Sequence, residues 1–459
     1  KDEQTLINEF LSFINYSVSP YHAVKATTNI LDKNGFIKLN ERDDWKTLKC
    51  GNYYFTRDQS TVIMFSIPKN YKIGNGFTIM GAHTDSPCFK VKPKSKKSAE
   101  GYIQIGIEKY GGLLAHTWFD RDLSVAGRVL IENKDDNTFE SKLVRINRPI
   151  MRISTLAIHL SRSVNTEGFK FDMETNTVPI FATEAALQLN SKLNVKTQSN
   201  VDGYHNSMLL RILSKALKCN PDNIFDFELY LHDTQKSCQG GALNEFIYSP
   251  RLDNLCSCFV ILKSLINSIK SSTYANETNI RVAGFFDNEE VGSDSNRGAG
   301  SNIVLSTLKR LSSPELFQSA IQKSILVSCD MAHAIHPNYS GKHESNHKPK
   351  MHKGVTLKYN SNQRYATNML SVFHLMKCAL KTKTNIQKFV VKNSQRCGST
   401  IGPILAKGCG IRTVDVGIPQ LSMHSIREVC GVKDICTTIT LFTEYYNSFT
   451  SLDKQLKAD

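Results

Sequence analysis

The segment FTIMGAHTDSP, residues 77–87, indicates the fold class of this 459-residue chain. Its first half is almost entirely apolar, which is typical of a strand buried on both faces of a parallel sheet. His83 and Asp85 follow at once, and because they stand two positions apart, both side chains project to one side of an extended chain. The pair suits a metal-binding histidine whose ring is held by a carboxylate. It also suits a turn, since Asp, Ser and Pro form turns, so other segments must supply partners.

Apolar strands alternate with helices on either side of a middle region of different composition. Strand patterns such as IRVAGFF and ILVSC are each followed by a helical pattern, and this alternation is typical of an α/β fold. It predicts a mostly parallel sheet that helices cover on both faces. In such sheets ligands bind beyond the carboxyl ends of the strands.

The middle region, residues 93–235, has a different pattern. Short strands such as YIQIGIE and RVLIE follow one another with turn residues between them, and long helical patterns are scarce. This predicts a β-rich insertion. We therefore expect a discontinuous α/β catalytic domain, residues 1–92 and 236–459, interrupted by a second domain at residues 93–235.

The formal charge of +15 indicates a basic surface, which could attract nucleic acid, anionic lipid or acidic small molecules. Residues 90–97, KVKPKSKK, are the densest basic run. No helix-turn-helix, zinc-finger or RNP motif accompanies this run. We therefore expect lysines spread over a solvated surface and no nucleic-acid partner.

The cysteines and the apolar runs narrow the class of protein further. Twelve cysteines are scattered along the chain, and the closest pair, Cys256 and Cys258, lies in a helical apolar pattern. This favours buried free thiols in a reducing compartment over a zinc–thiolate site. No apolar run approaches the length of a transmembrane helix, so we expect no membrane partner. Residues 1–15 predict an amphipathic helix and not a signal peptide.

Charged and imidazole side chains recur where other predicted strands end. They are Glu289 and Glu290 after VAGFFDN, Asp330 and His333 after ILVSC, His424 after VDVGIPQL, and Asp253 at the start of a helix. Together with the 77–87 segment, these are five distant segments that we expect at one edge of the sheet. Two histidines and three carboxylates suit two divalent metal ions that share a carboxylate and activate a water between them. One of the two adjacent glutamates could bind metal while the other takes the proton.

Each of these residues has a more ordinary explanation when taken alone. Asp253 suits a helix N-cap, Glu289 suits a carboxylate at a helix start, and His424 suits a structural histidine. Together, these explanations would leave several charges in one pocket without compensation, which is costly. The joint pattern therefore favours a metal site.

Seven motifs resemble those of the aspartyl aminopeptidase family, a branch of the di-zinc exopeptidases. They are GAHTDSP, SPRLDN, FDNEEVGS, SCDMAHA, HKGVTLKYNSNQRYAT, RCGSTIGP and DVGIPQLSMHSIRE. The resemblance runs from about residue 10 to about residue 450. It implies one zinc ion held by His83, Asp253 and Asp330, and a second held by Asp253, Glu290 and His424, with Asp253 as the bridge. It also implies Glu289 as the general base and Asp85 as the carboxylate that orients His83. Mn²⁺ or Co²⁺ could replace zinc at such mixed ligands.

The resemblance further implies cleavage of peptides after an N-terminal Asp or Glu. Lys358 and Tyr365 match positions that bind the acidic side chain. A cation in a desolvated pocket favours a carboxylate over a neutral side chain. His333 and Met423 match positions that line the substrate site. His159 matches a histidine that reaches the active site of a neighbouring subunit. Simpler explanations are an exposed strand lysine for Lys358, packing for Tyr365, and a core or interface histidine for His159.

The same resemblance implies a homo-oligomer, in which the insertion makes dimers and the dimers form a tetrahedral dodecamer. Some relatives carry an N-terminal extension for delivery to a vacuole. We expect none here, and therefore a cytoplasmic protein.

Three rival functions remain open at this stage. A di-metal amidohydrolase acting on acylated amino acids would use the same site, and differs in needing no free substrate α-amine. A non-catalytic cargo or binding protein could keep the fold, although all ligand positions are filled here. A nucleic-acid-binding role rests on the net charge alone.

Overall fold

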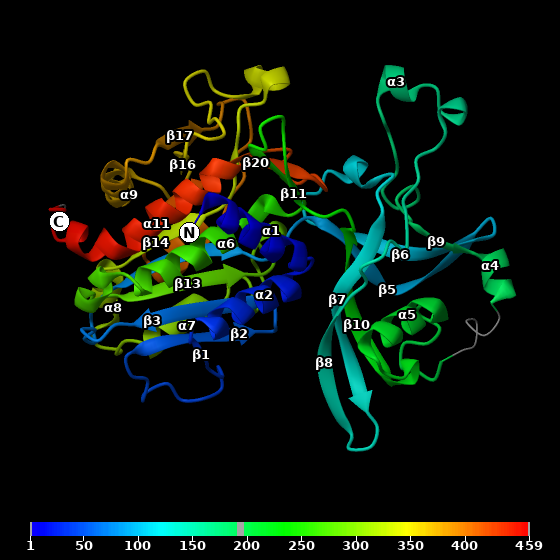
Figure 1. The fold of residues 1–459 in the computed structure, drawn as a ribbon, viewed down its shortest axis with the longest axis horizontal. Helices are drawn as coiled ribbons and strands as arrows, with labels where there is room; N and C mark the ends of the chain where they lie inside the picture. Colours follow the sequence, from blue (N-terminus) through cyan, green and yellow to red (C-terminus); the bar gives the residue numbers. More distant parts are fainter. Residues whose placement is uncertain (1, 191–196, 458–459) are drawn as a thin grey trace. The chain divides into compact units, whose positions relative to one another are not determined.

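The computed structural model describes residues 2–190 and 197–457 (Figure 1). The chain divides into two compact units. The large unit consists of Lys1–Ser86, Ser237–Met423 and Glu428–Asp459, and the insertion unit consists of Pro87–Lys236 and His424–Arg427. The roles expected for the two parts, catalysis and dimerisation, remain proposals.

The large unit is built on a nine-stranded sheet. Its strands are, in spatial order, β1 (Ile37–Lys38), β2 (Gly51–Arg57), β3 (Thr61–Ile67), β13 (Ile280–Phe286), β4 (Phe77–His83), β14 (Ile325–Cys329), β18 (Arg412–Gly417), β16 (Val355–Tyr359) and β17 (Ile386–Val390). Five of the eight neighbouring pairs are parallel, and three are antiparallel. The expected mostly parallel α/β sheet is therefore confirmed, with an unbroken parallel run β13-β4-β14-β18 at its centre.

Helices cover both faces of this sheet. Successive residues of a strand point to opposite faces, and the strands carry apolar residues on both. Val62 and Met64 of β3 pack into one core cluster, whereas Ile63 and Phe65 pack into another. The first face is covered by α1 (Glu3–Tyr16), α2 (Pro20–Lys33), α6 (Leu252–Ile269), α9 (Met369–Thr382) and α11 (Val432–Asp453). The second face is covered by α7 (Ile303–Arg310), α8 (Phe317–Gln322) and α10 (Ile401–Cys409).

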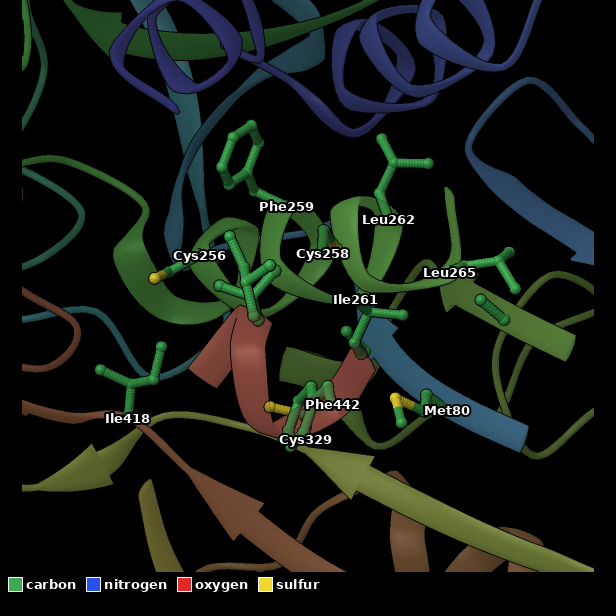
Figure 2. Close-up of a cluster of buried hydrophobic side chains, with 14 of the residues drawn as sticks. Met80, Cys256, Cys258, Phe259, Ile261, Leu262, Leu265, Cys329, Ile418 and Phe442 are labelled. Carbon is green, nitrogen blue, oxygen red and sulfur yellow. The ribbon is translucent and has the colours of Figure 1, made fainter. Parts of the chain in front are cut away.

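Helix α6 lies at the centre of the first core cluster. Figure 2 shows its Ile261 pointing toward Met80 of β4 and Phe442 of α11, while Phe259 projects from the opposite side of the helix, where it packs against Phe10 of α1. The helix has 18 residues with a mean hydropathy of 1.3, so it meets the length and composition of a membrane span, contrary to the expectation that no apolar run comes near that length. Since 83% of it is buried inside the structure, its apolarity is explained by its place in the core.

The large unit also contains a second sheet, which has five strands. Its strands are, in spatial order, β11 (Cys238–Gly240), β12 (Phe246–Ser249), β20 (Glu428–Gly431), β19 (Pro419–Leu421) and β15 (Ala332–His333). Strands β15 and β19 follow β14 and β18 in the chain and pair with each other. Asp330 therefore lies between β14 and β15, and Met423 lies between β19 and β20, which also pair with each other.

The insertion unit is built on a six-stranded antiparallel sheet. Its strands are, in spatial order, β8 (Thr138–Arg145), β7 (Leu123–Asn133), β10 (Ile224–Asp233), β5 (Cys88–Ala99), β6 (Tyr102–Tyr110) and β9 (Ile180–Thr183). Its described helices are short, namely α3 (Val164–Glu167), α4 (Glu184–Leu189) and α5 (Ser207–Leu217). The scarcity of long helices matches the expectation from the sequence, but the strands are longer than expected, since β5 has 12 residues, β7 has 11 and β10 has 10.

The basic run 90–97 lies on β5, and part of its charge is used within the insertion unit. Lys92 Nζ lies 2.8 Å from a Glu174 carboxylate oxygen, and Lys97 Nζ lies 3.7 Å from it. Lys90 lies over the ring of Tyr230, 4.8 Å from its centroid. These contacts agree with a solvated, internally paired surface.

All twelve cysteines lie in the described part of the chain and are free thiols. Cys256 and Cys258 are buried in α6, as expected. The expectation of burial does not extend to every thiol, since Cys50 and Cys238 are exposed. Cys50 directly precedes β2 and Cys238 is the first residue of β11, and side chains reach solvent easily where a strand begins.

Candidate active site

Three neighbouring parallel strands place the central residues of the site. His83 is the last residue of β4 and lies opposite Phe286 of β13. Thr84 N then donates to Phe286 O at 2.8 Å, so the two chains leave the sheet together. Asp330 follows β14, the strand on the other side of β4. Because parallel strands end at one edge, the residues that follow them meet there.

Carboxylates from three segments converge on Nε2 of His83, which is 1% exposed. Nε2 lies 3.3 Å from Asp253 Oδ1, at the start of α6. It lies 3.7 Å from Asp330 Oδ1 and 3.7 Å from Glu289 Oε2. Asp253 lies there because its φ and ψ, −80° and 105°, are not helical, so the first turn of α6 is irregular.

Asp85 connects the histidine to the two adjacent glutamates. It is fully buried, and its Oδ1 lies 3.3 Å from Nδ1 of His83. Its Oδ1 accepts a hydrogen bond from Glu289 N at 3.1 Å, and its Oδ2 accepts one from Glu290 N at 3.0 Å. One carboxylate therefore sets the position of both the histidine ring and the Glu289–Glu290 backbone.

The turn that carries the glutamates is held by residues outside the predicted set. Asp287 N donates to Thr61 Oγ1 at 3.0 Å, and the Asp287 carboxylate lies 3.1 Å from Nε of Arg297. Burial, and then the charge of Asp85, raise the pKa of Asp287 to about 6, although Arg297 opposes this. Asn288 has a φ of +62°, which reverses the chain before the 3₁₀ turn Glu289–Val291. Such left-handed positions favour Asn over other non-glycine residues.

The excess of carboxylates dominates the electrostatics of this cluster. Burial by itself disfavours the charged form of His83, but the charge of Glu289 and the contacts with Asp253 and Asp330 outweigh it and raise its pKa well above the ordinary value. Burial also raises the pKa of Glu289, and the charges of Asp330 and Glu290 add to this, although His83 opposes it. A cation between these groups would offset the repulsion.

The donor set fits a zinc ion. Nδ1 of His83 lies 3.0 Å from the carbonyl oxygen of Asp85, and a carbonyl only accepts, so Nδ1 carries a hydrogen. Nε2 is therefore the ring atom that would bind a metal ion, which would take the place of its proton. The ligand atoms of two groups lie within 4.8 Å of one another, namely His83, Asp253 and Asp330, and His83, Glu289 and Glu290. Imidazole nitrogen and carboxylate oxygen are ligands that zinc takes.

His424 belongs to the insertion unit, although it directly follows Met423 of the large unit. Its φ is +68°, and its Nδ1 lies 3.0 Å from Gly112 O. Since this carbonyl can only accept, Nδ1 carries a hydrogen, so Nε2 is the ring atom with the lone pair in the neutral histidine. Met423 is half-buried and packs against the first core cluster.

Lys358 and Tyr365 lie together in the large unit, with Nζ of Lys358 5.3 Å from the centroid of the Tyr365 ring. Lys358 is 3% exposed, which rules out the exposed strand lysine that its alternation with apolar residues suggested. Within the described ranges, no carboxylate lies at ion-pair distance from its Nζ. Burial raises the pKa of Tyr365, so its hydroxyl stays protonated and can donate a hydrogen bond.

The two remaining predicted residues are exposed. His333 lies on the short strand β15, and its ring centroid is 6.0 Å from that of Phe389. His159 lies in the 3₁₀ helix Ile158–Leu160 of the insertion unit. The insertion unit thus presents His159 on its surface, so it is not the core histidine that its apolar surroundings suggested.

Over residues 13–446, the sequence matches the aminopeptidase I zinc metalloproteases, family M18. The chain belongs to this family. The family resemblance carried by the seven motifs is therefore confirmed. Zinc, the metal predicted for this chain, is the metal of the family.

Relatives of this M18 chain cover almost its whole length. An aspartyl aminopeptidase of Dictyostelium discoideum is 47% identical over 97% of each chain. A chain in the cryo-EM structure of the Ape4 and Nbr1 complex is 44% identical, with a TM-score of 0.96, over 100% of this chain and 88% of its own. A chain of the Saccharomyces cerevisiae mApe1 dodecamer is 29% identical, with a TM-score of 0.84, over 99% of each. The α/β fold with its insertion is therefore that of M18 aminopeptidases.

Sequence reasoning missed residues that support the site without standing at a strand end. Asp415 lies inside β18, in an otherwise apolar run, and its carboxylate accepts from Thr400 and Ala366. The motif RCGSTIGP leads into a helix, since Thr400 is the N-cap of α10 and accepts from Gly402 N. A lone Asp between β-branched residues was the available signal for the first, and Thr before an apolar run was the signal for the second.

Proposed function

We propose that this M18 chain removes N-terminal Asp or Glu residues from peptides. The observation that supports it best is the carboxylate cluster around the buried His83, in a chain of a zinc aminopeptidase family. Acidic specificity is supported by the name of its Dictyostelium relative, and by a buried lysine without an anionic partner among the described residues.

The proposed ligands of one zinc ion are His83, Asp253 and Asp330, and those of a second are Asp253, Glu290 and His424, with Asp253 shared. The first set is supported by ligand atoms that lie within 4.8 Å of one another. The tautomer of His424 supports its place in the second set, since its Nε2 can accept a metal. When bound, such ions would polarise the scissile carbonyl and lower the pKa of a water, and Mn²⁺ or Co²⁺ could do the same.

Glu289 is the proposed general base and acid. It would take a proton from the attacking water and deliver it to the leaving amine nitrogen. Its Oε2 lies 3.7 Å from Nε2 of His83, beside the proposed metal position, and Asp85 fixes its backbone nitrogen. Asp85 also orients the ring of His83.

The first residue of the substrate would be held by its α-amine and by its side chain. Carboxylates near the second metal would bind its free α-amine. Lys358 and Tyr365 would bind its acidic side chain, because an ammonium and a phenol both donate hydrogen bonds to a carboxylate. His333, Met423 and His159 would contact substrate, with His159 supplied by a neighbouring subunit.

The assembly and location that we propose are a homo-oligomer in the cytoplasm. A dodecamer is supported by the S. cerevisiae mApe1 structure, with 29% identity, and dimers would form through the insertion unit. A reducing compartment is supported by the twelve free thiols.

The first experiment is hydrolysis of Asp-, Glu-, Leu- and N-acetyl-Asp-peptides, with and without a chelator and added zinc. We expect chelator-sensitive cleavage of the Asp- and Glu-peptides alone. Cleavage of the acetylated peptide would favour an amidohydrolase of acylated amino acids. No cleavage by the zinc-loaded, assembled protein would favour a non-catalytic cargo or binding role.

A further inference from the structure

Asp415 is a fully buried carboxylate next to the lysine that we propose for substrate recognition. It lies on β18, which pairs with β16 in antiparallel register, Leu357 opposite Val416. One residue further along each strand, Lys358 stands opposite Asp415. Cross-strand partners have Cβ atoms about 5 Å apart and side chains on one face, so the buried lysine and the buried aspartate are direct neighbours.

The two carboxylate oxygens of Asp415 are nevertheless taken by neutral donors. Thr400 Oγ1 donates to Oδ1 at 2.6 Å, and Ala366 N donates to Oδ2 at 2.6 Å. Such short bonds are typical of acceptors that carry charge. Burial raises the pKa of Asp415, whereas hydrogen bonds from its neighbours and the charge of Lys358 lower it.

These donors belong to two separate loops. Ala366 follows Tyr365, and Thr400 begins α10 after the segment 396–399. Ser399 Oγ also donates to Arg364 O at 3.3 Å, so the loops contact each other. Asp415 N donates to Thr367 Oγ1 at 2.9 Å as well. One aspartate therefore fastens the Tyr365 loop and the start of α10 to the central sheet.

The arrangement leaves the ammonium of Lys358 with a nearby negative charge but no ion pair. A buried lysine without any counter-charge would be costly. A lysine in a direct ion pair would have its donors occupied, and an incoming carboxylate would have to displace the partner. A carboxylate whose two oxygens already accept hydrogen bonds from Thr400 and Ala366 provides the charge, and without an ion pair to it the donors of Lys358 are left to the ligand.

We propose that Asp415 is a positioning residue for acid specificity, which stabilises the unpaired Lys358 through space and holds Tyr365 beside it. The inference rests on the proposed function, since it explains how the acidic side chain is selected. Asp415 touches neither substrate nor metal in this scheme. It acts through Lys358 and Tyr365.

Gly402 provides an independent way to test the carboxylate. A Cβ at this position would lie 2.4 Å from Asp415 Oδ1 and 2.5 Å from Oδ2, so the carboxylate would have to move. Gly408 lies in the same helix, α10, and a Cβ there would meet nothing within 4 Å. Alanine favours a helix over glycine at both positions, so only Gly402→Ala disturbs Asp415.

The experiment compares an Asp-peptide with its neutral isostere, an Asn-peptide, for the zinc-loaded wild type and for Asp415→Asn, Gly402→Ala and Gly408→Ala. We expect the ratio of kcat/KM for Asp over Asn to fall about tenfold in the first two variants, mainly through KM for the Asp-peptide. Gly408→Ala should keep the wild-type ratio. A residue that only supports the fold would lower both substrates together and leave the ratio unchanged.

A ratio within about twofold of wild type in both Asp415→Asn and Gly402→Ala would overturn the inference. If Asp415→Asn does not fold, Gly402→Ala against Gly408→Ala decides alone. A wild-type protein that cleaves Asp- and Asn-peptides equally would overturn the proposed specificity, and the inference with it. The wild-type arm therefore separates the two failures.

Discussion

The His83 cluster and the Lys358 environment are built on one sheet and are unbalanced in opposite senses. Around His83, Asp253, Asp330 and Glu289 approach within 3.7 Å of one imidazole nitrogen. Around Lys358, a buried ammonium has no carboxylate at ion-pair distance within the part of the chain that the structure describes. Each region carries charge that its own residues leave incompletely compensated.

The sign of each imbalance indicates the ligand that would correct it. Clustered carboxylates repel one another unless a cation lies between them, so the His83 cluster favours divalent metal. A buried ammonium is costly without an anion, so the Lys358 environment favours a carboxylate. A peptide that begins with Asp or Glu would bring an anion to the second region while its scissile bond meets the first.

The largest effect should come from Glu289→Gln, which removes the proposed base and none of the proposed zinc ligands. We expect kcat to fall about 10²- to 10⁴-fold on Asp- and Asn-peptides alike, because proton transfer is lost for both. Zinc content, measured by mass spectrometry, should stay at the wild-type level. Glu315→Gln changes an exposed glutamate of the same unit and should have wild-type kcat. Near wild-type turnover by the zinc-loaded Glu289 variant would assign the base to another group.

Lys358→Met should change the Lys358 environment, and it should lower the preference for Asp- over Asn-peptides and not the turnover of both. It keeps the length of an apolar stem and removes the charge, so we expect the preference for the Asp- over the Asn-peptide to fall about 10- to 100-fold, the value of a hydrogen bond between charged groups. Cleavage of the Asn-peptide should be nearly unchanged. Lys388→Met is the matched control, since Lys388 lies on the neighbouring strand β17, opposite Leu357, and is exposed. An unchanged Asp preference in Lys358→Met would remove this lysine from acid recognition.

The sequence made the first region easier to find than the second. Continuous apolar strands predict where a parallel sheet ends, and His83, Glu289 and Asp330 all follow such strands. Because these residues all follow strands that end at one edge of the sheet, the sequence predicted that their side chains would lie close together. The 3.7 Å contacts themselves depend on the irregular start of α6 and the turn at Asn288, which local sequence patterns do not determine.

The second region was hidden because burial depends on what covers a strand. Lys358 alternates with apolar residues, which is typical of a strand with one solvent-exposed face. Every residue of β16 from Val355 to Lys358 is nevertheless buried. Asp415 stands inside an apolar strand, and its partners come from segments 49 and 15 residues away. Glycines at positions 402 and 408 also weakened the helical pattern of α10. No local signal reports such long-range packing.

Asp453, a fully paired and partly buried carboxylate, provides the smallest and most general test of this comparison. Asp453 accepts hydrogen bonds from Arg412 Nη1 at 2.8 Å and Nη2 at 3.0 Å, and its Oδ1 lies 3.0 Å from His374 Nε2. Burial opposes its ionisation, but these partners lower its pKa from 3.8 to about 2. The ionised form is therefore favoured by folding, and its contribution is complete well above pH 3.8 and is lost as pH falls towards 2.

Asp453→Asn should consequently lower the free energy of unfolding by about 1 kcal/mol at pH 7, a value reduced for partial exposure. Urea denaturation at pH 7, 5, 4 and 3 would follow the difference from wild type. This difference should shrink between pH 4 and pH 3, because the Asp453 carboxylate of the unfolded wild-type chain protonates there while the folded one stays largely ionised. Asp44→Asn, in an exposed pair with Lys46 at 3.9 Å, should change stability little at any pH. A deficit that stays constant from pH 7 to pH 3 would mean that packing, and not charge, explains the role of Asp453. The Asp453 variant would then not measure how much an ion pair contributes to stability. The free-energy cost of burying Lys358 without an ion pair would have to be measured directly.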